Sequence, residues 1–205
     1  MNLEYKPGEN ITDRQVAQEL NISRTPVREA LRLLEHEGLI VSQPRRGWRV
    51  YTLSLKDIEE IFDIKIVLES AIARWAATCE DAEKKSALKE ALARMKRAVA
   101  ENDREAWVEA DLALHDVIFS MCGNQRAVRV VKNMNDQWWR VRIGLIAMEG
   151  RMARSTREHE VIVSAIVAGD PDAAERQMRT HLESLRRELI HVLTNLVLPF
   201  AHHGM

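Results

Sequence analysis

The chain has 205 residues, which fits one large domain or two modest ones, and 46% of them are hydrophobic, enough for a buried core and too many for a disordered chain. Its 30 basic and 31 acidic side chains leave a net charge of −1, which excludes a strongly basic protein, so any DNA-binding surface must be a local patch. The two cysteines, Cys79 and Cys122, form no CxxC pair, and no apolar run reaches the about 18 residues of a membrane span. Because the N-terminus has no signal-peptide pattern, we expect a cytoplasmic protein with no membrane segment.

The first part of the chain predicts two helices separated by a short turn. Thr12 is placed to cap the first helix, and the apolar residues that follow it have helical spacing. The second helix has Pro26 in its first turn and ends at Gly38, a C-terminal stop. The apolar residues expected to face the core are Val16, Ala17, Leu20, Val27, Ala30, Leu31 and Leu34.

Two short runs rich in β-branched and aromatic residues follow, LIVSQ and WRVYTL, joined by the turn-forming PRRG. They predict a small β-hairpin, or wing. Helix, short turn, helix and hairpin is the element order of a winged helix-turn-helix. We therefore expect residues 1–52 to form a DNA-binding domain of this kind.

Arginines follow one stripe of the second predicted helix. Arg24, Arg28 and Arg32 recur at intervals of four, opposite the apolar positions. Such spacing alone is also typical of a solvated helix face. Arg45 and Arg46 lie at the tip of the hairpin. The stripe directly after the turn and the arginines at the tip favour DNA, with the helix in a major groove and the hairpin on phosphate or in a minor groove.

Residues 53–205 predict a succession of helices whose apolar positions are spaced as in a bundle. Gly169, Asp170 and Pro171 mark the clearest boundary, because they are a C-cap, an N-cap and a first helical residue in turn. The six predicted helices cover residues 54–78, 81–101, 103–122, 124–148, 152–168 and 171–197. The expected fold class is mainly α, a winged helix-turn-helix followed by an all-helical antiparallel bundle.

One carboxylate and three imidazoles are candidate metal ligands. Asp111 and His115 are four residues apart and share a helix face, while His159 and His181 lie on the last two predicted helices. If these helices adjoin, the four side chains converge as a set that suits zinc, nickel, manganese or iron. A histidine on a helix is more often a surface residue or a hydrogen-bonded core residue, so spacing alone leaves the metal site open.

Few other residues indicate chemistry. Trp138 and Trp139, with Arg140 and Arg142, fit a pocket that binds a carboxylate, but they also fit a core tryptophan beside solvated arginines. The chain has no GxSxG, GxxxxGK[ST] or GxGxxG motif, and no pair of carboxylates stands out as an acid–base couple.

The motifs resemble those of one family of regulators. SRTPVREALRLLEHEGLI, residues 23–40, closely resembles the recognition-helix signature of the GntR family, and PGENITDRQVAQELNI resembles the segment that precedes it there. The later part resembles the FadR subfamily, which carries an FCD effector-binding domain, an all-helical bundle. DLALH at 111–115 matches that domain's D-x-x-[FL]-H motif, and residues 158–182 match its EH…GD…H pattern.

For the N-terminal domain, the resemblance implies a homodimer that binds near-palindromic operator DNA and usually represses transcription. Arg14, Arg24 and Arg28 stand at positions that read DNA in the family, and Gly47 at the glycine of the wing tip. We expect Thr25 to contact the DNA backbone, with Arg46 assisting from the wing.

For the helical domain, the resemblance implies a small-molecule effector, expected to be a carboxylic acid, whose binding releases the DNA. Asp111, His115, His159 and His181 stand at the family's metal-ligand positions. We expect a divalent transition metal, zinc first, with nickel, manganese or iron as alternatives. The metal would lie at the floor of the effector pocket, and Lys65, Arg140 and Arg142 are candidate effector-binding residues.

Three departures from the family pattern bear on these expectations. The family's winged domain opens with a helix before the Pro-Gly turn, whereas only MNLEYK precedes Pro7 here, so we expect that helix to be missing. Lys65 replaces the usual arginine, which keeps the charge but loses bidentate geometry. Residues 1–52 carry eight basic and seven acidic side chains, so DNA binding would depend on placement and dimerisation.

The function expected is therefore that of a DNA-binding transcription regulator, not an enzyme. One alternative is a metal-dependent helical enzyme that acts on a small organic acid, because an Asp/His centre with an open position can activate water. Another is a ligand-binding dimer without DNA activity, if the missing helix disables the winged domain.

Overall fold

The computed structural model describes residues 5–146 and 148–194, and over residues 138–146 it describes the backbone alone. The chain forms two compact units. The first is built on residues up to Ser54, and the second contains Leu55–Met134 and the residues from Trp138 onward. Each unit is described by itself.

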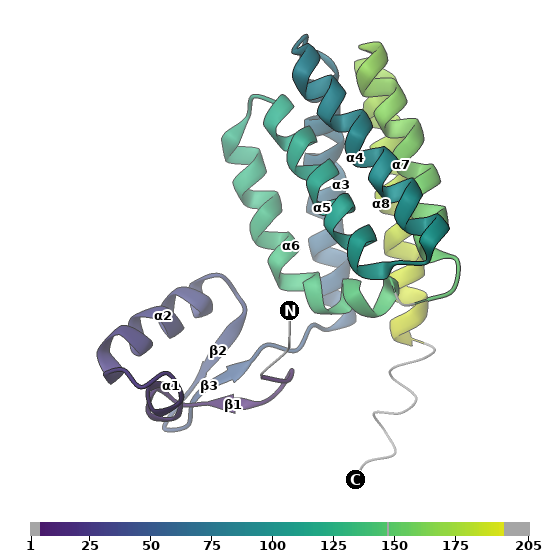
Figure 1. The fold of residues 1–205 in the computed structure, drawn as a ribbon. Helices are drawn as coiled ribbons and strands as arrows, with labels where there is room; N and C mark the ends of the chain where they lie inside the picture. The colour runs from purple at the N-terminus through teal and green to yellow at the C-terminus, as the bar shows by residue number, and fades with distance from the viewer. Residues whose placement is uncertain (1–4, 147, 195–205) are drawn as a thin grey trace. The chain divides into compact units, whose positions relative to one another are not determined.

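The first unit is a winged helix-turn-helix, as predicted (Figure 1). Helices α1 (Asp13–Glu19) and α2 (Arg24–His36) are followed by strands β2 (Ile40–Gln43) and β3 (Gly47–Val50). A third strand, β1 (Asn10–Ile11), pairs with the other edge of β3, so the antiparallel sheet has the order β1-β3-β2. Strand β1 was not predicted, because two residues are too few to show an alternating pattern.

The predicted caps fix the ends of the two helices. The Thr12 hydroxyl accepts a hydrogen bond from the Gln15 backbone N–H at 3.1 Å, satisfying a donor that the first turn of α1 leaves unpaired. Gly38 follows the end of α2 with a φ of 76°. Glu35 then ties α2 to the hairpin, because its carboxylate accepts hydrogen bonds from the Ser42 backbone and the Trp48 indole, each at 3.2 Å.

The core of the first unit is narrower than predicted. Its buried apolar residues are Ile11, Ala17, Val27, Leu31, Ile40 and Val50, with Tyr5, Val16 and Trp48 partly buried against them. The expectation that Leu20, Ala30 and Leu34 face this core is wrong, because all three are exposed. Leu20 lies beyond the last residue of α1, and on α2 only the positions in line with Val27 and Leu31 face the sheet.

Gly47 is required where β3 passes β1. Its φ is 84°, and a Cβ atom there would lie 2.5 Å from the carbonyl oxygen of Ile11. A side chain would therefore both strain the backbone and collide with the neighbouring strand.

Over the residues that the structure describes, the second unit is an antiparallel bundle of six helices, as predicted (Figure 1). The boundaries fall within a few residues of those expected, except for the expected end of the last helix at residue 197, which lies outside the described residues. The helices are α3 (Leu55–Ala77), α4 (Ala82–Glu101), α5 (Arg104–Met121), α6 (Gln125–Ile146), α7 (Arg151–Ala168) and α8 (Pro171–Val192). Among the residues described, no helix is long and apolar enough to cross a membrane.

Aspartates cap helices α5 and α8 of the bundle, and the cap at Asp170 is the predicted one. Asp103 and Asp170 each accept a hydrogen bond from the backbone N–H three residues later, at 3.0 and 2.9 Å. Pro171 opens α8, and Gly169, with a φ of 71°, ends α7. These local signals set the positions at which the chain reverses. They thereby determine which side of each helix is buried in the bundle.

Helix α3 packs against α5, α7 and α8, which places it at the centre of the bundle. Most of its inward residues are apolar, such as Ile58, Phe62 and Ile72. Two charged residues, Lys65 and Glu69, interrupt this apolar face and are buried with it. They lie next to the site described below.

Candidate metal centre and DNA-binding helix

Three of the four predicted metal ligands converge inside the bundle. Asp111 and His115 project from one face of α5, and His159 projects from α7. One ligand atom from each lies within 4.8 Å of the others. The His159 Nε2 atom is 3.1 Å from His115 Nε2 and 3.5 Å from Asp111 Oδ1, and Asp111 and His159 are both buried.

The fourth predicted ligand, His181 of α8, lies beside this cluster. Its ring centroid is 4.5 Å from that of His159. Its Nδ1 is 2.7 Å from a carboxylate oxygen of Glu158, so we assign the tautomer in which Nδ1–H donates to Glu158 and Nε2 carries the lone pair. The structure therefore places His181 next to the three-residue cluster without including it in that cluster.

His159 has a comparable outer contact. Its Nδ1 lies 2.8 Å from the carbonyl oxygen of Ser155, so we assign the proton to Nδ1 and the lone pair to Nε2, the atom that faces Asp111 and His115. Metal-binding histidines in proteins usually donate their second ring N–H to a carbonyl or carboxylate in this manner. His159 and His181 both have that arrangement.

The donor set fits a transition metal ion. Two imidazole nitrogens and a carboxylate oxygen face one another in a buried space, and such N/O sets suit zinc, nickel, manganese or iron. Burial lowers the pKa of His115 to about 4, so its imidazole is neutral at neutral pH, as metal ligation requires. The buried His115 Nδ1 has no hydrogen-bond partner among the described residues.

An ion pair adjoins the cluster on α3. Lys65 and Glu69 are ion-paired one helical turn apart, with side chains only 2% and 1% exposed. Glu69 Oε2 lies 3.9 Å from His115 Nδ1. Burial alone would raise the pKa of the Glu69 carboxyl, but the charge of the neighbouring Lys65 holds it below its usual range. Lys65, a predicted effector-binding residue, is thus engaged by a carboxylate of its own helix.

The buried Arg151 and its carboxylate partners lie next to His181. Arg151, at the start of α7, is buried, and its Nη1 lies 3.3 Å from Glu188 Oε2 and 3.8 Å from Glu158 Oε2. Burial would raise the pKa of Glu158, but the hydrogen bond from His181 and the charge of Arg151 bring it below its ordinary value. The Glu158 carboxylate therefore lies between Arg151 and His181.

The other predicted effector residues, Arg140 and Arg142, lie on α6. Their side chains, like those of Trp138 and Trp139, lie outside the part of the chain whose side chains are described.

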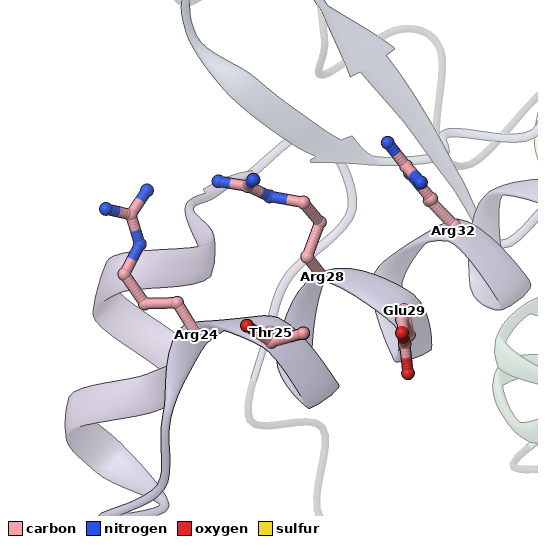
Figure 2. Close-up of a pocket in the computed structure, with 5 residues that line it drawn as sticks. All are labelled: Arg24, Thr25, Arg28, Glu29 and Arg32. Carbon is pink, nitrogen blue, oxygen red and sulfur yellow. The ribbon is translucent and has the colours of Figure 1, made fainter.

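The predicted arginine stripe is present on α2. Arg24, Arg28 and Arg32 line a surface hollow together with Thr25 and Glu29. Figure 2 shows the three guanidinium groups rising from one side of the helix, with Glu29 pointing away from them. The side chains of Arg24 and Arg28 are 58% and 50% exposed. This side of α2 therefore presents basic groups to solvent, while Val27 and Leu31 face the core.

The remaining DNA-binding candidates lie nearby in the first unit. Arg14 on α1, Thr25 on α2 and Arg46 in the hairpin turn are exposed, and Gly47 opens β3 beside that turn.

Asp13, the first residue of α1, bonds to two of the arginines. Its Oδ1 and Oδ2 atoms lie 3.0 and 3.1 Å from Arg24 Nη2, and Oδ2 also accepts from Arg28 Nε at 3.0 Å and Nη2 at 2.5 Å. Hydrogen bonds from Arg28 and Arg24 hold the pKa of the Asp13 carboxyl below its usual value. This carboxylate therefore remains ionised beside the arginines.

Four residues that shape these sites were not predicted from the sequence, namely Asp13, Glu69, Arg151 and Glu158. Two of them had a signal in the sequence, since Glu69 follows Lys65 by four residues and Glu158 directly precedes His159. Asp13 and Arg151 had none, because each depends on a tertiary contact between separate helices.

Comparisons with known proteins agree with this arrangement. Residues 1–50 match the bacterial regulatory proteins of the gntR family, and residues 60–184 match the FCD domain. The chain is similar to the uncharacterized HTH-type transcriptional regulator YdhC of Bacillus subtilis, with 28% identity over 92% of this chain and 85% of the relative. It is 29% identical to the HTH-type transcriptional repressor RspR of Escherichia coli, over 87% of this chain and 78% of that one.

Solved structures share the fold. Escherichia coli McbR/YncC superposes with a TM-score of 0.78 at 18% identity, covering 91% of this chain and 89% of that one. A putative GntR transcriptional regulator from Rhodococcus sp. RHA1 gives a TM-score of 0.70 at 23% identity, over 92% and 90% of the two chains. The families and the sequence relatives are transcription regulators, and none supports an enzyme. The chain belongs to the GntR family of bacterial transcription regulators and carries an FCD domain.

Proposed function

We propose that this regulator is a homodimeric repressor that binds near-palindromic operator DNA in the cytoplasm and releases it when a small carboxylic acid binds beside a metal ion in the helical unit. The convergence of Asp111, His115 and His159, with His181 beside them, is the observation that carries the proposal. A buried set of this composition, in which His159 and the adjacent His181 each have an outer hydrogen bond, suits metal binding better than it suits a packed core.

The four residues would hold the ion, zinc first, with nickel, manganese or iron as alternatives. When bound, a divalent ion would act as a Lewis acid and attract the carboxylate of the effector. Lys65, Arg140 and Arg142 are the proposed effector-binding side chains. Because Glu69 already neutralises Lys65, its ammonium adds little net positive charge for an anionic effector.

The winged unit would place α2 in the major groove of each half-site. Arg24 and Arg28 would contact guanine edges or phosphates, and Thr25, Arg14, Arg46 and Gly47 would contact the backbone or the adjoining groove. Two copies of the chain would read half-sites about one helical turn apart. Repression is supported by RspR, a relative that is named as a repressor.

Selection from random-sequence duplexes tests the DNA-binding half of this proposal. The wild-type protein is expected to enrich a near-palindrome, and Arg24→Ala is expected to lose about 1–3 kcal/mol of affinity for it, the usual loss for one bidentate contact to a base. Arg94→Ala removes an exposed arginine of α4 and serves as the matched control. Equal affinities of Arg24→Ala and Arg94→Ala for the selected duplex would contradict the assignment of α2 as the reading helix.

A further inference from the structure

We propose that Asp13 is a positioning residue that orients the Arg24 and Arg28 guanidinium groups, and that it thereby sets the sequence specificity of DNA binding. This inference rests on the proposed role of α2 as the reading helix. A buried acid would thereby have a favourable role on a surface that binds a polyanion.

The geometry is that of an anchor shared by two side chains. The Asp13 side chain is only 11% exposed, whereas those of Arg24 and Arg28 are 58% and 50% exposed. Arg24 donates to both carboxylate oxygens through Nη2, and Arg28 donates to Oδ2 through Nε and Nη2. The carboxylate thus holds the Nε/Nη2 edge of Arg28 and the single Nη2 nitrogen of Arg24.

Asp13 is well placed to act on these two arginines selectively. It begins α1, which packs against α2, and the Thr12 cap fixes the backbone directly before it. Arg32, the third arginine of the hollow, is not among its bonded partners in the described structure. The anchor therefore acts on the two arginines nearest the start of α2.

Two physical effects of Asp13 have opposite consequences for DNA binding. Orienting a flexible arginine before binding reduces the rotamer freedom that the complex must remove, which strengthens contacts that need one geometry. The negative charge meanwhile reduces the attraction to phosphate, which governs binding to any sequence. Removal of the charge is therefore expected to weaken binding to the operator while leaving binding to other DNA equal or stronger.

The experiment compares Asp13→Asn with the wild-type protein on two labelled duplexes, the one that the wild type selects from a random pool and a scrambled version of it. Fluorescence anisotropy over a range of salt concentrations gives the affinities. For Asp13→Asn we expect about a tenfold loss on the selected duplex and no loss on the scrambled one. Binding to the scrambled duplex should become equally or more salt-dependent.

Two variants serve as controls. Glu37→Gln removes the same charge from an exposed side chain at the far end of α2 and should leave the ratio of the two affinities unchanged. Asp13→Glu keeps a carboxylate and should recover part of that ratio, which separates the anchor from a general loss of folding.

The outcomes distinguish this inference from the proposed function. If Asp13→Asn binds both duplexes more tightly to the same extent, Asp13 is only a counter-charge and the inference is wrong. An unchanged affinity ratio would also overturn it while leaving the proposed function intact. If the wild-type protein enriches no sequence, the proposed DNA-binding function fails, and the inference fails with it.

Discussion

In the candidate metal centre, the orientation of His181 is set by its neighbours. Its Nδ1 is 2.7 Å from Glu158, and the buried Arg151 lies on the other side of that carboxylate. The Glu158 carboxylate fixes both the ring orientation and the tautomer that exposes the Nε2 lone pair. In the proposed metal centre, Glu158 would therefore position the His181 ligand rather than bind the ion itself.

Glu158→Ala is expected to weaken zinc binding about 10–100-fold, the usual effect of removing an outer hydrogen-bond partner of a ligand histidine. Competition with a chromophoric zinc chelator measures this affinity. Glu160→Ala is the matched control. It removes a carboxylate on the surface of α7, the helix that also carries Glu158, and this carboxylate is ion-paired with Lys96 of α4. If the two variants bind zinc equally well, Glu158 does not position a ligand.

At the scale of elements, Gly47 determines whether β1 can join the wing. Gly47→Ala would bring Cβ to 2.5 Å from the Ile11 carbonyl oxygen, so we expect β1 to separate from β3. Hydrogen exchange followed by mass spectrometry should then show loss of protection in peptides that contain these strands. The loss of protection should correspond to a free-energy change larger than the roughly 1–2 kcal/mol that a positive φ alone costs an alanine.

Gly123→Ala is the matched control for this substitution. Gly123 has a similar φ of 72°, but a Cβ atom there would meet nothing within 4 Å. Its effect should be limited to the backbone strain. Unchanged protection of β1 and β3 in Gly47→Ala would show that the close approach does not require glycine.

Elements with local signals could be predicted from the sequence. Gly169, Asp170 and Pro171 mark a helix boundary by backbone chemistry alone, and the structure confirms it. Leu20 and Leu34 were placed wrongly because periodicity gives the direction of an apolar face but not its width. Strand β1 depends on a partner distant in sequence, which no local pattern reveals.

The candidate site, too, could be predicted from the sequence only in part. The spacing of Asp111 and His115 put them on one face of a helix, and the structure confirms that shared face. Their approach to His159 depends on how α5 and α7 pack, which the family resemblance implied and spacing left open. The role of Asp13 arises from contacts with arginines of another helix, and that of Glu158 from a contact with His181 of α8, and neither contact can be read from the sequence.

At the scale of the whole molecule, the chain joins a DNA-binding unit to a unit with a candidate metal centre. A regulator of this design needs an effector whose affinity differs between two states of the protein, because only such a difference can shift DNA affinity. A metal ion that binds a carboxylate inside the bundle would supply much of that affinity. The metal is thus the part of the proposed function on which effector control depends.

The most direct test is the metal content of the purified full-length protein, measured by elemental analysis without added metal or chelator. We expect about one zinc, nickel, manganese or iron ion per chain in the wild type and in the control His191→Ala, and almost none in His159→Ala. A wild-type protein that is folded, binds its selected duplex and contains no metal would contradict metal-dependent sensing and would make the buried Asp/His cluster a structural feature of the bundle.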